Sequence, residues 1–157
     1  MSGIEWRYLA FDELTVTQLY AVLQLRSEVF VVEHACIFQD MDGADAQAMH
    51  LLGTLQGSLV AYARCFAIGI KYAETSIGRI VTHPSIRGSV AGHALVEKAI
   101  RSLAAQSGAQ DIRIGAQARL ESFYRQHGFE KSGPPYMEDG ILHIEMLRRF
   151  NFQGVDR

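Results

Sequence analysis

A turn rich in glycine separates an apolar strand from an amphipathic helix near the middle of this 157-residue chain. An apolar, β-branched run ends at His83-Pro84, Arg87-Gly88 follows it, and the helical pattern begins near Gly92. Glycines let a backbone come close to a ligand, and the N-terminus of a helix attracts negative charge through its amides and its dipole. Arg87 adds a permanent positive charge at this turn. The arrangement predicts a site for an anionic cofactor that carries a pyrophosphate.

The composition narrows the class of protein. A formal net charge of -2 gives no basic face for a nucleic acid, and no apolar run approaches the ~18 residues that a membrane span needs. Two cysteines are too few for a disulfide framework or for a zinc site built on thiolates, and the six histidines lack ligand spacing. The start of the chain has no secretory pattern. We therefore expect a cytoplasmic protein with no metal, no nucleic-acid partner and no membrane partner.

The periodicity of the apolar residues predicts one domain over residues 1–157. Thr15 and Gln18 have the spacing of a capping box, which predicts a first helix that runs to about Val29. Gly57 falls in the turn of a predicted hairpin, and Gly108 falls where a second helix would end. The expected strands are 4–9, 50–55, 59–66, 76–82, 112–116, 130–132 and 141–147, and the later helices are 92–106 and 120–127. Residues 33–49 are expected to form a loop or a short irregular helix.

This order of elements predicts an α/β (α+β) fold. It consists of a mixed, mostly antiparallel sheet of about six to seven strands, with helices on both faces and a central β-α-β crossover. The predicted phosphate turn follows the fourth strand, at the entrance to that crossover.

Five stretches that cover most of the chain carry a family resemblance. They are LYAVLQLRSEVFVVEH (19–34), QDMDG (39–43), VAYARC (60–65), IGAQARLESFYRQHGF (114–129) and EDGILHIEM (138–146). Together with the order of elements, they resemble the GNAT superfamily of acyl-CoA-dependent N-acetyltransferases, and its ElaA-type branch in particular. The resemblance implies a single GNAT domain with acetyl-CoA as the acyl donor. It also implies direct transfer of the acetyl group, in a ternary complex, to a primary amine of a small molecule or a protein.

The resemblance also implies which residues bind the donor. The family's pyrophosphate turn reads R/Q-x-x-G-x-G/A, and Val90 stands here where the middle glycine is usual. Either Val90 keeps a right-handed backbone, or the loop is distorted and binds CoA weakly. The backbone of the fourth strand would hold the pantetheine arm where two strands splay, with an N–H near Val81 as oxyanion donor. The implied donor-binding residues are Ile80, Val81, Thr82, Arg87, Gly88, Ser89, Val90, Ala91, Gly92, His93 and Tyr124.

By the same resemblance, Tyr124 protonates the departing CoA thiolate, although it would also fit as a packing residue against its aromatic neighbours. Three residues are candidates for the base that accepts the amine's proton: Glu33, His50 and His143. Arg26 and Arg79 lie in apolar sequence and need partners, and Arg26 is expected to tie the first helix to residues 33–42. A cationic amine is one ligand that the acidic side chains in the following loop could recognise, namely Asp40, Asp42 and Asp45.

Two other functions stay open. RSEVF is similar to a segment of acyl-homoserine-lactone synthases, although those enzymes have a longer chain and a larger acyl pocket. A degenerate CoA-binding module would result if the Val90 turn no longer supported turnover. Because strand edges of this fold often pair between subunits, a homodimer is one of the oligomeric states that the sequence leaves open.

Overall fold

Eight strands form one sheet in this protein, whose computed structural model describes residues 3–88 and 90–151. The first strands are β1 (Ile4–Ala10), β2 (Met49–Leu55), β3 (Ser58–Phe66) and β4 (Thr75–Thr82), and the later ones are β5 (Ile112–Gln117), β6 (Glu130–Lys131), β7 (Tyr136–Glu138) and β8 (Ile141–Arg148). Their order across the sheet is β1-β2-β3-β4-β5-β8-β6, and β7 also pairs with β8. The pairing is antiparallel except between β4 and β5, which the crossover helix joins. The predicted mixed, mostly antiparallel fold is therefore confirmed.

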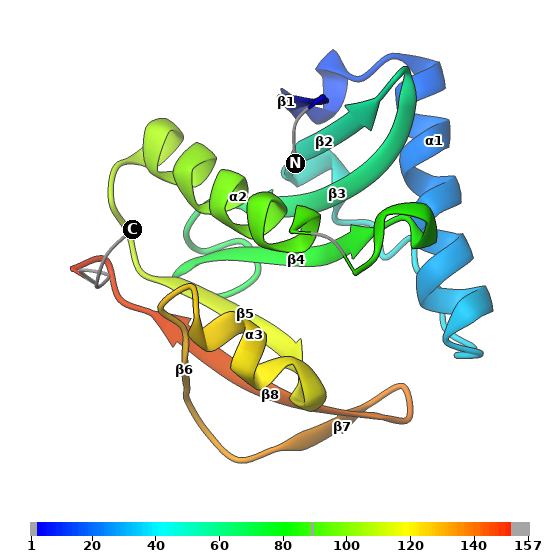
Figure 1. Cartoon of the computed structure of the whole chain (residues 1–157). Helices are drawn as coiled ribbons and strands as arrows, with labels where there is room; N and C mark the ends of the chain where they lie inside the picture. The colour runs from blue at the N-terminus through cyan, green and yellow to red at the C-terminus, as the bar shows by residue number, and fades with distance from the viewer. Residues whose placement is uncertain (1–2, 89, 152–157) are drawn as a thin grey trace.

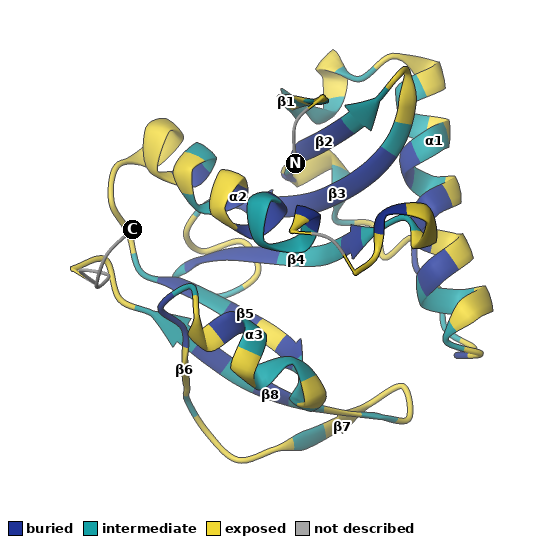
Figure 2. Cartoon of the chain, in the orientation of Figure 1, coloured by how far each residue is buried: buried dark blue, intermediate teal, exposed yellow. Residues whose placement is uncertain are grey.

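Helices cover both faces of the sheet (Figure 1). Helix α2 (Ala91–Ser107) and the short α3 (Glu121–Arg125) lie on one face, and α1 (Val16–Arg26) lies on the other. Alternation along β3 divides the core, because Ala61 and Ala63 pack in the cluster with α2, while Tyr62 packs with α1. Burial is densest in the central strands and on the inner side of α2 (Figure 2).

Local signals in the sequence define several element ends. The Thr15 hydroxyl accepts a hydrogen bond from the Gln18 amide at 3.0 Å, and the Gln18 side chain accepts one from the Thr15 amide at 2.9 Å, which confirms the capping box. Gly108 ends α2 with φ 79°, a conformation that favours glycine. Gly57 has φ 83° in the β2–β3 turn.

Two boundaries differ from the sequence prediction. The first α-helix ends at Arg26, and the chain continues as a π-helical segment, Ser27–Glu33. The helical part of the chain therefore extends past the expected end at Val29. The sheet has eight strands rather than six or seven, because Tyr136–Glu138 pairs with β8 directly after two prolines, which themselves cannot donate to a ladder. None of the helices in the described ranges is long and apolar enough to cross a membrane.

Candidate active site

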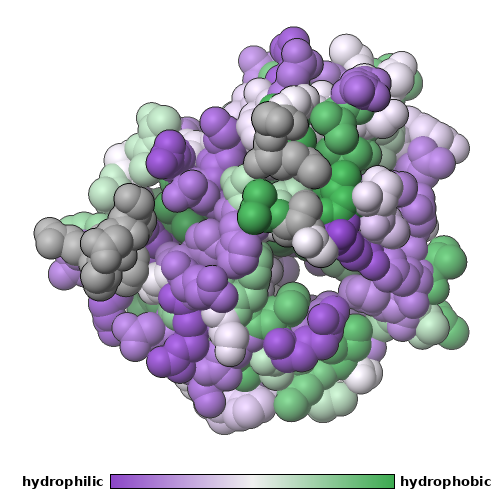
Figure 3. Space-filling view, viewed as in Figure 1, coloured by the Kyte–Doolittle hydropathy of each residue, from purple (hydrophilic) through white to green (hydrophobic). Residues whose placement is uncertain are grey.

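A pocket opens where β4 and β5 separate. The two strands pair only at Thr75 with Ile112 and at Ser76 with Arg113, and then they diverge (Figure 1). The pocket is lined by residues from both strands, by α3, by the segment before β2 and by the β7–β8 hairpin. A space-filling view shows the molecule hollowed between the part that carries α1 and the part that carries α3 (Figure 3). The splayed strands predicted at the fourth strand are therefore present.

A β-bulge bends β4 at this edge. Tyr62 on β3 faces Val81 on β4, and Arg64 on β3 faces Gly78 on β4. Two residues of β4, Arg79 and Ile80, therefore lie opposite the one residue of β3 that separates Tyr62 from Arg64. Arg79 has φ 48°, a left-handed conformation that costs a non-glycine residue about 1–2 kcal/mol. The bulge turns this part of β4 toward the pocket, where residues 77–80 form one wall.

The glycine turn leads directly into α2. Gly88 has φ 82°, whereas Val90 has φ -82° and ψ 6°. Val90 therefore has the negative φ that the first alternative requires, in the bridge region beside the right-handed helix. Val90 is also the N-cap residue, and its side chain cannot accept a hydrogen bond from the first amides of the helix. Of the turn residues implied by the resemblance, Ser89 lies outside the described residues.

Side chains from α3 pack against the start of α2. A Cβ atom on Gly92 would lie 3.6 Å from the Phe123 ring, in ordinary van der Waals contact. His93 Nδ1 lies 3.0 Å from His127 Nε2, and both imidazole rings contact the Phe123 ring. These contacts fix the N-terminus of α2 beside α3.

Tyr124 lies on α3 and lines the pocket. It is only 6% exposed, and its ring stands edge-on to Phe123 and Phe129 at centroid distances of 5.1 and 6.0 Å. Burial raises the pKa of the Tyr124 hydroxyl well above its ordinary value, so the phenol stays protonated at neutral pH. The packing role and the chemical role predicted for Tyr124 are compatible in this position.

The opposite wall joins two segments that are far apart in the sequence. Cys36 Sγ donates to the carbonyl oxygen of Asp139 at 2.9 Å, which connects the segment before β2 to the β7–β8 hairpin. Phe30, Phe38 and Glu138 also line this wall, and none of the three is among the site residues predicted from the sequence. Their positions depend on contacts between distant segments, and the local signs were two stretches of the family resemblance, 19–34 for Phe30 and 138–146 for Glu138.

His143 is the one of the three predicted bases that lines the pocket. Its Nδ1 lies 2.8 Å from the Ile141 carbonyl, an acceptor, so Nδ1 carries the hydrogen and Nε2 is the free acceptor of the neutral ring. The Tyr136 ring stacks on the imidazole at a centroid distance of 5.8 Å. This geometry suits the uptake of a proton at Nε2.

The structure places the other two candidate bases elsewhere. Glu33 pairs with Arg87 at the glycine turn and does not line the pocket. His50 is fully buried, with Nδ1 at 2.6 Å from the Tyr62 hydroxyl and Nε2 at 2.9 Å from the Asp45 carbonyl. Burial lowers the pKa of His50. Both ring nitrogens of His50 are therefore occupied by structural contacts, away from the pocket.

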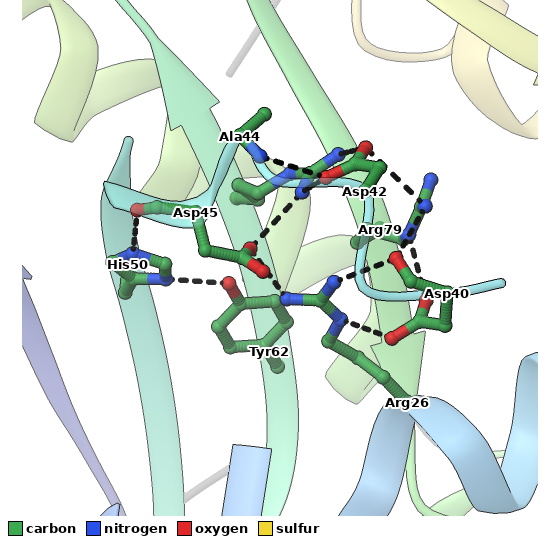
Figure 4. Close-up of polar contacts among 9 residues, drawn as sticks. Arg26, Asp40, Asp42, Ala44, Asp45, His50, Tyr62 and Arg79 are labelled. Atoms are coloured by element: carbon green, nitrogen blue, oxygen red, sulfur yellow. Dashed lines mark hydrogen bonds and ion pairs between the residues drawn. The ribbon is translucent and has the colours of Figure 1, made fainter. Parts of the chain in front are cut away.

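The acidic loop forms an ion-pair cluster with three arginines (Figure 4). Asp40 bonds to Arg26 and Arg79, and Asp42 and Asp45 bond to Arg64. Arg26 Nε donates to Asp40 at 2.9 Å, so Arg26 ties α1 to residues 33–42 as predicted, and its Nη1 also donates to Asp45 at 2.7 Å. Each of the three carboxylates forms ion pairs with arginines. The hypothesis that Asp40, Asp42 and Asp45 recognise a cationic amine is therefore wrong for this arrangement. No cluster of three or more potential metal ligands occurs within residues 3–88 and 90–151.

Comparison with known proteins identifies the class. The family model described as "Acetyltransferase (GNAT) domain" matches residues 21–150, and the chain therefore belongs to the GNAT acetyltransferase family. The protein ElaA of Escherichia coli is 42% identical over 147 residues, which cover 92% of this chain and 96% of ElaA. These findings confirm both the superfamily and the ElaA-like resemblance.

Solved structures agree with this assignment. The crystal structure of Escherichia coli ElaA has a TM-score of 0.87 at 40% identity and covers 93% of this chain and 99% of its own. An acyl-CoA N-acyltransferase from Pseudomonas aeruginosa has a TM-score of 0.89 at 37% identity, with coverage of 92% and 99%. The AHL synthase LasI shares the fold, with a TM-score of 0.74 at 16% identity and coverage of 96% and 92%.

Proposed function

We propose that this acyltransferase-family protein is an acetyl-CoA-dependent N-acetyltransferase that moves an acetyl group to a primary amine. One observation carries the proposal: the open edge of β4 and the buried Tyr124 face the same pocket. The glycine turn at the N-terminus of α2 is proposed to supply the anion site for the diphosphate of the donor. Acetyl-CoA would supply the acyl group as a thioester.

The main chain of two segments would hold the donor. Backbone groups of Ile80, Val81 and Thr82 are proposed to bind the pantetheine arm on the edge of β4 that faces β5, beyond the two residues of β4 that pair with β5. Amides of the turn between Gly88 and His93 are proposed to bind the diphosphate. The N–H near Val81 is proposed to stabilise the oxyanion. The negative φ of Val90 supports this fit, since the turn needs no glycine at that position.

Two side chains are proposed to move protons. Tyr124 is protonated at neutral pH, which is the form that can donate to a departing thiolate. His143 has Nε2 available to accept a proton from the attacking amine, directly or through water. Glu138, on the same wall, is proposed to hold the incoming ammonium group.

Direct transfer in a ternary complex is the proposed route. Cys36 is the cysteine that lines the pocket, its thiol donates to a backbone carbonyl, and no basic side chain within residues 3–88 and 90–151 is bonded to it. A thiol in that state is a poor nucleophile, so an acyl-cysteine intermediate is not part of the proposal. The shared fold of LasI gives no reason to prefer a lactone synthase, because the likeness extends to the fold alone.

The experiment measures the release of free thiol from acetyl-CoA with a panel of primary amines, together with calorimetry of CoA binding. Thiol release that depends on an amine, with acetylated amine found by mass spectrometry, would support the proposal. CoA binding without transfer to any amine would favour a degenerate CoA-binding module. The absence of CoA binding at millimolar concentration would overturn the proposal.

A further inference from the structure

Arg79 occupies the left-handed position of the β4 bulge. In bulges with one left-handed residue, that residue is usually glycine, because glycine has no Cβ to clash. The glycine of β4 is Gly78, which precedes the left-handed position by one residue and has no positive φ. The left-handed residue is Arg79, with φ 48°. The strained conformation therefore falls on a residue with a long side chain, and contacts of that side chain must stabilise it.

The Arg79 guanidinium is held by a single loop. Its Nε donates to Asp40 Oδ1 at 2.8 Å, and its Nη2 donates to the Asp40 carbonyl oxygen at 2.9 Å. The guanidinium also lies over the Phe38 ring at 5.6 Å from the centroid. Two charge-assisted hydrogen bonds to one residue fix both the position and the direction of the side chain (Figure 4).

Asp40 is itself anchored by α1. Its Oδ2 accepts from Arg26 Nε at 2.9 Å, and its carbonyl oxygen accepts from Arg26 Nη2 at 3.2 Å. Arg26 is fully buried at the end of α1, and Asp40 is 7% exposed. A single carboxylate therefore links α1 to the bulge, and solvent cannot easily replace either arginine.

We propose that Asp40 is a positioning residue, which holds Arg79 in its left-handed conformation and so keeps the β4 edge open toward the donor. This inference rests on the proposed function, because the edge in question is the one proposed to bind the pantetheine arm and the thioester. The Asp40 side chain does not line the pocket itself and acts through Arg79, which does.

Two substitutions at position 79 test this role. Arg79→Gly and Arg79→Ala both remove the guanidinium, but only glycine adopts the left-handed conformation without strain. We expect Arg79→Gly to have a kcat about 5- to 30-fold higher than that of Arg79→Ala, the range that the left-handed penalty implies. Equal kcat values for the two variants, or a lower value for glycine, would overturn the proposal.

Two substitutions in the acidic loop provide a second test. Asp40→Asn keeps the shape of the side chain but removes the charge of the carboxylate that accepts from Arg79 Nε, and leaves Asp42 Oδ2, at 3.5 Å from Arg79 Nη2, as a weaker ion-pair partner. We expect kcat to fall about 10-fold. The control Asp45→Asn removes a carboxylate that bonds to Arg26 and Arg64. We expect it to lower the melting temperature while kcat stays within about 3-fold of wild type. If the two variants lose kcat in proportion to their loss of melting temperature, the role of Asp40 is only structural.

CoA affinity, measured by calorimetry in all four variants, separates this inference from the proposed function. If the wild-type protein transfers no acetyl group, the proposed function fails. The inference then still requires Arg79→Gly to bind CoA more tightly than Arg79→Ala. If the wild-type protein is active and the two position-79 variants do not differ, the inference alone fails.

Discussion

Arg87 and Glu33 form a two-pronged ion pair at the glycine turn, although 54 positions separate them in the sequence. Arg87 Nη2 donates to Glu33 Oε1 at 2.8 Å, and Nη1 donates to the other carboxylate oxygen. The Arg87 guanidinium lowers the pKa of Glu33, so the carboxylate is charged at neutral pH. Glu33 therefore neutralises the positive charge that the turn offers to a phosphate.

Replacing Glu33 is expected to tighten CoA binding. In Glu33→Gln, Arg87 no longer has a charged partner and can interact with a phosphate, so we expect the Kd for CoA to fall about 2- to 5-fold, the range for an exposed ion pair. Calorimetry measures this change. The control is Glu28→Gln, an exposed carboxylate on the same π-helical segment that lies near His83 rather than Arg87. Weaker binding by Glu33→Gln would show that Glu33 supports the turn instead of competing for Arg87.

Removing the Tyr124 hydroxyl is expected to slow the reaction without affecting donor binding. Tyr124→Phe keeps the ring contacts with Phe123 and Phe129, and we expect kcat to fall about 10- to 100-fold with little change in acetyl-CoA affinity. Steady-state kinetics and calorimetry measure the two quantities. Unchanged turnover would remove Tyr124 from the acid role.

The turn is expected to need glycine at position 88 and not at position 90. Gly88 has φ 82°, and a Cβ atom there would meet nothing within 4 Å, so Gly88→Ala introduces backbone strain alone. We expect CoA affinity to fall about 5- to 30-fold. Val90→Gly is the matched change at a position of negative φ, and it is not expected to tighten binding. Tighter binding by Val90→Gly would show that valine distorts the loop.

His143 and Glu138 are expected to have different kinetic roles. We expect His143→Gln to lower kcat about 100-fold, because the free imidazole nitrogen is the proposed proton acceptor. Glu138→Gln is expected mainly to raise the KM for the amine, because its proposed role is to bind the ammonium group. Initial rates at varied amine concentration distinguish the two. The roles are reversed if Glu138→Gln lowers kcat and His143→Gln changes only KM.

The ion-pair cluster is expected to make folding sensitive to acid. Hydrogen bonds from Arg64 lower the pKa of Asp42. Its ionised form therefore contributes stability above the ordinary aspartate pKa of about 3.9, and this contribution is lost as the pH falls through the lower native value. We expect Asp42→Asn to be less stable than wild type by about 2 kcal/mol at pH 7. Urea unfolding should show this difference shrinking below pH ~4, and a difference that is independent of pH would contradict the prediction.

The sequence by itself determined the local features of this protein. Thr15 with Gln18, Gly57 and Gly108 each act within a few residues, so their types and spacing predicted a helix start, a hairpin turn and a helix end. The glycine turn before α2 is equally local. The family resemblance also depends on short patterns, and the family model confirmed it.

Only the tertiary structure decided which distant side chains meet. The pairing of Glu33 with Arg87 and of Asp40 with Arg79, and the burial of His50, depend on how the loop before β2 packs across the sheet. The left-handed Arg79 was equally beyond a local pattern, because glycine stands beside it rather than at its position. Such contacts are selected by packing and charge between segments far apart in the chain, and no spacing within one segment encodes them.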